Sequence, residues 1–212
     1  MHFEDVVKER RSIRRYKDKF VPLSLVGELI DIAKHAPSAG NLQNWRMIIV
    51  TESDMRQQLA EASMEQYWMV EAPVHIVICN DYDKVKDHYP VMGKMYSIQN
   101  CAAIAYAIML AAHDAGLGTC WVGAFDNEKV QRLLDIPDNI DPEIILTLGY
   151  SDDTKNPQLR DQIKYLCFQE KWGAKFKKFD NEYDGVEKRI KFEMNKLKNK
   201  LKPIKKKAKK KK

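Results

Sequence analysis

The run of residues from Ser97 to Asp126 (SIQNCAAIAYAIMLAAHDAGLGTCWVGAFD) constrains the fold more than any other stretch. It predicts a helix that is apolar nearly all round, and such a helix must be buried all round. Gly116 and Gly118 predict its end, because glycine adopts a positive φ at low steric cost. A short strand is expected over 119–122, and Gly123 then allows another group to approach the backbone closely. The small side chains along the helix predict close packing against a second helix, from this chain or from a second copy.

The chain of 212 residues is long enough for one domain with its own core. Its apolar fraction of 44% is that of an ordinary globular protein. The first residues are charged, and neither a signal peptide nor a membrane span is expected. The cysteines show no CxxC and no Cys/His metal spacing, so we expect free thiols in a reducing cytoplasm and no structural metal. They are Cys79, Cys101, Cys120 and Cys167.

The C-terminal end carries most of the excess positive charge. The last 17 residues contain 11 lysines and no acidic residue. Subtracting these 11 from the 36 basic residues leaves 25 against 30 acidic ones, so the rest of the chain is mildly acidic. We expect a compact domain over 1–180 and a lysine-rich extension over 181–212, helical from 186 to about 201 and disordered from about 203. The extension could contact nucleic acid or anionic lipid non-specifically, or it could simply be a solubilising segment.

Four arginines surround one serine in the segment ERRSIRRY, residues 9–16. Guanidinium groups match the oxygens of a phosphate, and a hydroxyl can add a further hydrogen bond. In an extended backbone the side chains alternate, so Arg10, Ser12 and Arg14 share one face while Ile13 lies on the other. The segment therefore predicts either an anion site that Ile13 anchors or a solvated basic face.

A helix predicted over 22–35, with Ser24 as its N-cap, leads into the loop APSAGNLQNW, residues 36–45. The predicted buried stripe of this helix consists of Leu25, Leu29, Ile32 and Ala33. The loop has small side chains, backbone donors and the amides of Asn41 and Gln43, which suit the polar edge of a planar ligand. A plain helix-to-strand connection is the alternative.

Further elements follow from hydrophobic periodicity. Strands are predicted over 46–51, 74–79 and 144–148, and the second is central because it is almost continuously apolar. An edge strand is predicted over 163–168, and helices over 3–9, 52–64 and 127–134, the last capped by Asn127 or Asp126. His75 has no metal-ligand partner at a useful spacing and is interpreted as structural. The aromatic segment Tyr67–Met69 is either a ligand lid or ordinary packing.

Four segments together resemble the FMN-dependent nitroreductase family. They are RRSIRRY, APSAGNLQNWRMIIV, GLGTCWVGAFD, and ILTLGYSDD followed by Arg160, and they extend over roughly residues 3–173. The resemblance implies an α+β fold, with a mixed sheet flanked by helices, in an obligate homodimer that binds FMN at its interface. An apolar helix that requires a close partner agrees with this expectation.

The resemblance also implies which residues hold the cofactor. By position, Arg10, Ser12 and Arg160 would bind the FMN phosphate, with Arg11 nearby. Arg14 would lie by the pyrimidine side of the ring, where a cation stabilises the negative charge of reduced flavin. The partner chain would line the ring with Pro37, Ser38, Asn41 and Gln43. Backbone N–H groups of Gly123 and Ala124 would face flavin N5.

The activity implied by the resemblance is ping-pong hydride transfer. NADH or NADPH would reduce the flavin, and an electron-poor acceptor such as a nitroaromatic or a quinone would reoxidise it, so no side chain need act as a nucleophile or an acid. One alternative is a specialised member of the same superfamily, either a dehalogenase or a flavin-fragmenting enzyme. Another is a flavin-binding protein whose basic tail binds nucleic acid.

Overall fold

The computed structural model describes residues 1–153 and 158–175. Contacts divide the chain into two compact units, Met1–Pro157 and Gln158–Lys212. The predicted lysine-rich helix and tail lie outside the described residues, so the expectations for 181–212 stay predictions.

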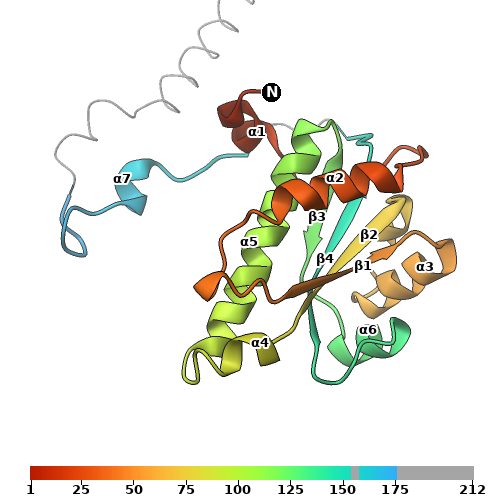
Figure 1. Ribbon diagram of the computed structural model, residues 1–212. Coiled ribbons are helices and arrows are strands. Elements are labelled where there is room, and N and C mark those ends of the chain that lie inside the picture. Colours follow the sequence, from red (N-terminus) through yellow and green to blue (C-terminus); the bar gives the residue numbers. More distant parts are fainter. Residues whose placement is uncertain (154–157, 176–212) are drawn as a thin grey trace, which may run out of the picture. The chain divides into compact units, whose positions relative to one another are not determined.

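The first unit is built on a four-stranded sheet in the order β1-β2-β4-β3 (Figure 1). The strands are β1 (Trp45–Val50), β2 (Val74–Asn80), β3 (Gly118–Val122) and β4 (Asp141–Gly149). All three pairings are antiparallel, so the expectation of a mixed sheet is wrong for these strands. A parallel contact does exist, but it is an isolated bridge between Ser12 and Thr119, because the arginine-rich segment pairs with β3 at one residue only.

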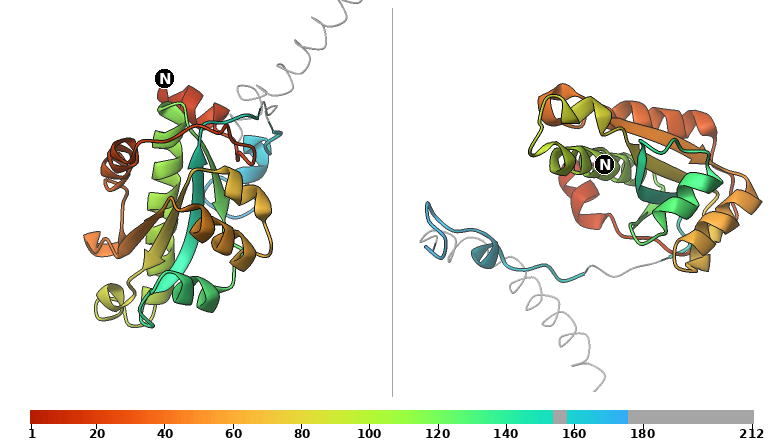
Figure 2. Two further views of the ribbon diagram at one scale, coloured as in Figure 1. Left: turned by 90° about the vertical axis from the view of Figure 1, so that its right-hand side faces the viewer. Right: turned by 90° about the horizontal axis from the view of Figure 1, so that it is seen from below.

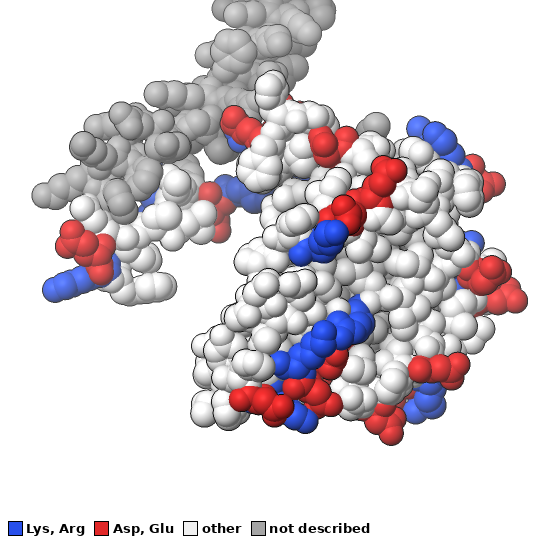
Figure 3. Space-filling view, viewed as in Figure 1, with Lys and Arg blue, Asp and Glu red and all other residues white. Residues whose placement is uncertain are grey.

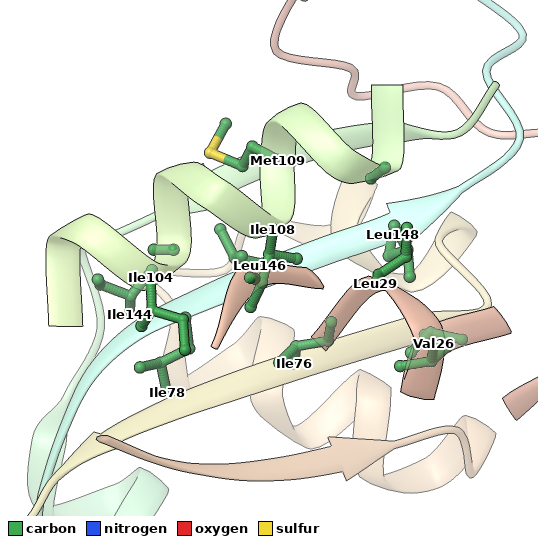
Figure 4. Close-up of a cluster of buried hydrophobic side chains, with 14 of the residues drawn as sticks. Val26, Leu29, Ile76, Ile78, Ile104, Ile108, Met109, Ile144, Leu146 and Leu148 are labelled. Carbon is green, nitrogen blue, oxygen red and sulfur yellow. The ribbon is translucent and has the colours of Figure 1, made fainter. Parts of the chain in front are cut away.

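Helices cover both faces of this sheet (Figures 1 and 2). One face packs against α2 (Leu23–Ala33) and α5 (Gly93–Asp114), and the other against α3 (Ser53–Ala62) and α6 (Asn127–Leu133). Side chains of β2 alternate between the two layers, with Ile76 and Ile78 toward α5 (Figure 4) and Val77 and Cys79 toward α3 and α6. Because every residue of β2 is buried, the predicted central strand is confirmed.

The connecting elements of this unit are short. They are α1 (Phe3–Glu9), the 3₁₀ turns η1 (Ala39–Asn41) and η2 (Tyr67–Glu71), and α4 (Asp83–Lys86). The helix ends of α2 and α6 correct one prediction and confirm another. The N-cap of α2 is Pro22, not Ser24, and Ile32 of the predicted stripe is 62% exposed while Val26 is buried. Asp126 caps α6 as predicted, because its Oδ1 accepts a hydrogen bond from the Lys129 N–H at 3.0 Å.

Helix α5 lies in the core but is not buried all round. It starts at Gly93 and packs its buried face against α2 and the sheet. Met95, Ile98 and Tyr106 lie on its opposite face and are 44%, 40% and 45% exposed. Among the described residues, α5 alone has the length and hydropathy to cross a bilayer, a test that the core helix of a globular protein also passes. The prediction of complete burial is therefore wrong for a single chain.

The glycines after α5 have different roles. Gly116 ends the helix with φ +78°, as predicted. Gly118 has no positive φ, which corrects that prediction. Its hydrogen is required instead by packing, because a Cβ there would lie 2.7 Å from Cγ1 of Ile13.

Three of the four cysteines are buried in the first unit. Burial raises the pKa of the Cys79 thiol to about 11 and that of Cys101 to about 12. Cys120 is also buried, and none of the four cysteines, including half-buried Cys167 of the second unit, forms a disulfide.

The second unit contains a short helix, α7 (Ile163–Leu166), where an edge strand was predicted. Its backbone makes local hydrogen bonds, from the Tyr165 N–H to the Gln162 carbonyl and from the Cys167 N–H to the Ile163 carbonyl. These bonds satisfy the groups that a strand would have offered to a neighbour. The rings of Phe168 and Trp172 then pack with centroids 4.9 Å apart.

Candidate functional site

The arginine segment, residues 10–16, is fixed along the edge of β3. The Ile13 N–H donates to the Thr119 carbonyl at 2.9 Å, and the Ile13 side chain is buried as predicted. The Tyr16 hydroxyl bonds to the Ile13 carbonyl at 2.8 Å and to Thr147 Oγ1 at 2.7 Å. Burial raises the pKa of Tyr16, so the phenol stays neutral and keeps both bonds. The segment is thus anchored by its apolar side chains while its polar ones are left for other contacts.

Several guanidinium donors at the start of this segment lack acceptors. Within the described residues, 1–153 and 158–175, Nε and Nη1 of Arg10 and Nε of Arg11 are buried and have no hydrogen-bond partner. Arg11 Nη1 donates to the carbonyls of Lys8 and Arg10 at 2.6 and 2.7 Å, so this side chain is oriented by the backbone. Buried charged donors without partners are costly and rare in folded proteins. Three such donors on neighbouring residues are what an anion site presents before its ligand binds.

His113, at the last turn of α5, is a part of this site that sequence reasoning missed. Its Nε2 is buried and has no hydrogen-bond partner in the part of the chain that the structure describes. Partial burial lowers its pKa first, and the positive fields of Arg10 and Arg11 lower it further, while Glu9 and Asp114 act in the opposite direction. The imidazole therefore stays neutral near pH 7 beside the two guanidinium groups. The only sequence signal was a histidine at the end of an apolar helix.

Arg14 and Arg15 are exposed, and each has a neighbour in the same unit. The Arg14 guanidinium carbon lies 5.5 Å from the centre of the Trp68 ring. Arg15 Nη2 lies 3.8 Å from an oxygen of Asp152. A cation held over an indole face keeps its charge while losing freedom of movement. Trp68 therefore orients Arg14. The prediction of a ligand lid over Tyr67–Met69 gave Trp68 no such role.

The rest of the predicted lid divides between packing and exposure. Met69 is fully buried, whereas Tyr67 is 53% exposed. Gln66, one residue earlier, donates from Nε2 to the Ser63 carbonyl at 2.9 Å and to the Ala124 carbonyl at 3.4 Å. The segment before β2 thus lies against the end of β3.

Gly123 and Ala124 follow directly after β3 and are both exposed. A Cβ on Gly123 would meet nothing closer than Trp121 Nε1, at 3.4 Å. The four residue steps from Thr119 to Gly123 span about 13 Å of extended chain. The arginine segment and this open backbone therefore lie at the two ends of one strand.

The 37–43 loop has an unusual backbone. Gly40, Asn41 and Gln43 all have left-handed φ, at 56°, 57° and 48°. Gln43 closes the loop, since its N–H donates to Ser38 Oγ at 3.2 Å and its Nε2 to Asn41 Oδ1 at 2.9 Å. Pro37, Asn41 and Gln43 are exposed and Ser38 is half-buried.

This loop and the arginine segment lie at different places along α5 (Figure 1). The loop is attached near the middle of the helix, through a hydrogen bond from the Ala39 N–H to Asn100 Oδ1 at 2.9 Å. The N-terminal residues instead reach the helix end, where the amino group of Met1 contacts Asp114 Oδ1 at 2.7 Å. One chain therefore does not bring the two predicted groups of cofactor contacts together.

Arg160 belongs to the second unit. It is exposed, and its Nη1 lies 3.4 Å from Gln158 Oε1. Its predicted contact with the phosphate stays a prediction.

An antiparallel sheet between two helical layers, with the arginine segment along its β3 edge, defines an α+β protein with a candidate ligand site. The family model described as the nitroreductase family matches residues 7–150, and the chain belongs to this family.

Relatives and solved structures agree with this assignment. A protein of Methanothermobacter thermautotrophicus, provisionally named NADH dehydrogenase/NAD(P)H nitroreductase, is 34% identical over 161 residues, which is 74% of this chain and 80% of the relative. An FMN-dependent nitroreductase from Clostridium difficile has a TM-score of 0.64 at 28% identity, covering 74% of this chain and 91% of that one. For B. megaterium NfrA2 the TM-score is 0.75 at 23% identity, covering 91% and 84% of the two chains, and it supports the fold alone.

Proposed function

We propose that the protein is an FMN-dependent oxidoreductase that takes hydride from NADH or NADPH and passes it to an electron-poor acceptor. The observation that carries the proposal is the set of buried guanidinium donors without acceptors on Arg10 and Arg11. A phosphate monoester supplies several anionic oxygens to such donors at once. The residues present therefore fit FMN, whose phosphate they would hold together with Ser12 and, from the second unit, Arg160.

Other residues of the same chain would contact the ring. Bound FMN supplies the redox chemistry, accepting hydride from the nicotinamide and donating it to the acceptor in alternating, ping-pong half-reactions. Arg14, held over Trp68, would place a fixed cation by the pyrimidine side, where reduced flavin is negative. The exposed backbone of Gly123 and Ala124 would offer N–H groups to N5, and glycine leaves the approach to the ring open.

We further propose that the functional unit is a homodimer. The 37–43 loop and the arginine segment are separated within one chain, so the loop would contact the flavin of the partner subunit. The exposed side chains of Met95, Ile98 and Tyr106 give α5 an apolar face that one chain leaves uncovered. Figure 3 shows, by contrast, red and blue side chains over α2 and on the side of α3 and α6. An uncharged apolar helix face is typical of the centre of a homodimer interface.

The donor and acceptor are proposed from the family. The M. thermautotrophicus relative carries NAD(P)H in its name, and a Staphylococcus haemolyticus relative at 24% identity is named NADPH-dependent oxidoreductase. A nitroaromatic or a quinone is the proposed acceptor class, because either is electron-poor and flat enough to stack on a flavin.

The test is the visible spectrum of the purified protein, followed by stopped-flow mixing with NADH and with NADPH under anaerobic conditions. We expect a flavin band that one or both nicotinamides bleach and that a quinone restores. A protein that stays colourless after incubation with FMN would overturn the proposal. Sedimentation of the yellow species tests the dimer separately.

A further inference from the structure

Three buried asparagines form a continuous line of hydrogen bonds beneath the 37–43 loop. Asn44 precedes β1, Asn80 ends β2, and Asn100 lies in the middle of α5; their exposed fractions are 0%, 0% and 5%. The Ala39 N–H donates to Asn100 Oδ1 at 2.9 Å, and Asn100 Nδ2 donates to Asn44 Oδ1 at 2.6 Å. Asn44 Nδ2 then donates to Asn80 Oδ1 at 2.7 Å, and Asn80 Nδ2 to Glu143 Oε1 at 2.8 Å. We call these three side chains the amide relay.

The two ends of the relay fix its direction. A backbone N–H can only donate, so Asn100 must turn its oxygen toward Ala39. A carboxylate can only accept, so Asn80 must turn its nitrogen toward Glu143. Asn44 lies between them and has one orientation that satisfies both neighbours. Reversal of any one amide would place like groups face to face at two contacts.

The relay ends at the most constrained backbone of the proposed site. Left-handed Asn41 and Gln43 are unfavourable for residues with a side chain, and they persist only where the surroundings hold them. The loop's own hydrogen bonds, from Asn41 N–H to Ser38 and from Leu42 N–H to Ala39, close it on itself. The bond from Ala39 to Asn100 attaches it to α5.

We propose that the amide relay is a positioning device that sets the 37–43 loop against the flavin ring, and that Asn44, Asn80, Asn100 and Glu143 act through it. This inference rests on the proposed function. Its reach is specific: the relay fixes the part of the loop that would touch the ring, and its bonds run to the loop, to Ser97 and to Glu143. Loss of the relay should therefore loosen the loop in the free protein and weaken FMN binding, while the phosphate contacts stay intact.

The directional character gives a sharp test. In Asn100→Asp the new carboxylate still accepts from Ala39, but its second oxygen faces Asn44 Oδ1. Asn44 and Asn80 can relieve this contact by reversing, at the cost of the bond from Asn44 Nδ2 to the Ser97 carbonyl at 3.2 Å, and Asn80 Oδ1 then lies against the Glu143 carboxylate. Adding Glu143→Gln replaces that carboxylate by a group that can donate. The effects of the double variant on loop exchange and on FMN affinity should therefore be smaller than the summed effects of the two single variants, although residues 100 and 143 share no direct bond.

The measurement is hydrogen exchange of the peptide over 37–43 in flavin-free protein, with the FMN dissociation constant as the second readout. We expect Asn100→Asp to speed exchange and to weaken FMN binding about tenfold each, and Glu143→Gln to restore part of both. Ser97→Ala is the matched control, because Ser97 Oγ accepts from Asn80 Nδ2 at 3.0 Å, beside the line from Ala39 to Glu143. It should leave the exchange of the loop unchanged.

Additive effects, unchanged exchange, or faster exchange with unchanged FMN affinity would each overturn the relay. Should Asn100→Asp not fold, Glu143→Leu removes the last acceptor at the surface end and is expected to speed the same exchange about threefold. Unchanged exchange in that variant would also overturn it. Failure of the proposed function is distinguishable, since the unmodified protein would then bind no FMN at all.

Discussion

The arginine segment and the 37–43 loop solve the same problem, holding polar groups ready for a ligand, in opposite ways. The segment has an ordinary extended backbone anchored by Ile13 and Tyr16, and its cost is in side chains, because buried donors of Arg10 and Arg11 lack acceptors. The loop has satisfied side-chain amides, and its cost is in backbone, with left-handed Asn41 and Gln43. A bound ligand can supply the missing acceptors of the guanidinium groups directly. The left-handed backbone of the loop is held instead by hydrogen bonds within the protein.

The largest expected effect concerns Arg10. Arg10→Met removes two unpaired buried donors, so flavin-free protein should be as stable as before or more stable, while FMN affinity falls about 100-fold or more, at about 1.5–3 kcal/mol per charged hydrogen bond. Thermal unfolding without FMN measures the change in stability, and a flavin titration measures the change in affinity. Arg15→Ala, which removes an exposed arginine 3.8 Å from Asp152, is the control and should change affinity less than about threefold. Equal loss in both variants would show that the site is only a basic surface.

Acid should lower the stability of the sheet to which the arginine segment is anchored. His75 is fully buried, its Nε2 contacts the Met69 carbonyl at 2.9 Å, and burial, with a smaller effect of Arg56, lowers its pKa to about 4. Above pH 6.5 both folded and unfolded states are neutral at this residue. Between pH 6.5 and about 4 the unfolded state binds the proton first, so the free energy of unfolding falls by about 3 kcal/mol in total.

Denaturant titrations at pH 7 and pH 4 measure this loss. In His75→Gln the difference between the two pH values should shrink by that amount, whatever the variant's overall stability. An undiminished difference would show that other groups cause the acid sensitivity.

The contact between Ile13 and Gly118 gives a smaller effect. Gly118→Ala would place a Cβ 2.7 Å from Ile13 Cγ1, so the segment must shift from β3, and we expect a loss of about 1–3 kcal/mol in unfolding free energy. Gly27→Ala is the control, because a Cβ there meets nothing within 4 Å and alanine favours the helix, so stability should rise by up to about 1 kcal/mol. Denaturant unfolding compares the two. A stable Gly118→Ala protein with unchanged FMN affinity would contradict the tight anchoring of the segment.

The smallest effect is expected at the Arg14–Trp68 pair. Trp68→Leu removes the ring under the guanidinium, a contact of about 0.5–1 kcal/mol at an exposed site, and should weaken FMN binding about two- to fivefold. Tyr67→Leu changes an exposed neighbour and should have no such effect. The midpoint potential of the bound flavin is the second readout, since a less ordered Arg14 stabilises reduced flavin less. No change in affinity or potential would remove Trp68 from the site.

Local pattern predicted most of the elements that carry the site. The apolar run of β2, the anchor at Ile13 and the cap at Asp126 depend on neighbouring residues only, and each is confirmed. The mixed sheet was expected from the family resemblance and is wrong for these four strands, and periodicity could not have corrected it because it reports burial and not strand direction. Helix α7 was missed because a short run that mixes apolar and polar residues, such as Ile163–Leu166, fits either a strand or one helical turn.

The amide relay and the role of Trp68 lay beyond sequence reasoning. Asn44 lies just before β1, Asn80 in β2, Asn100 in α5 and Glu143 in β4, and no local sequence pattern marks any of them. Their relation exists only once the sheet and α5 are packed together. The exposed apolar face of α5 was read as buried for a similar reason, because composition cannot tell whether a neighbour belongs to the same chain.

The burial of the cysteines has a practical consequence. With pKa values of about 11 and 12, Cys79 and Cys101 hold only about one thiolate in 10⁴ to 10⁵ molecules at neutral pH, and neither is accessible to a reagent. Cys120 is equally enclosed, so an alkylating dye should reach half-buried Cys167 first. The native chain therefore carries its own labelling position, and that position lies in the second unit, the one that contains Arg160.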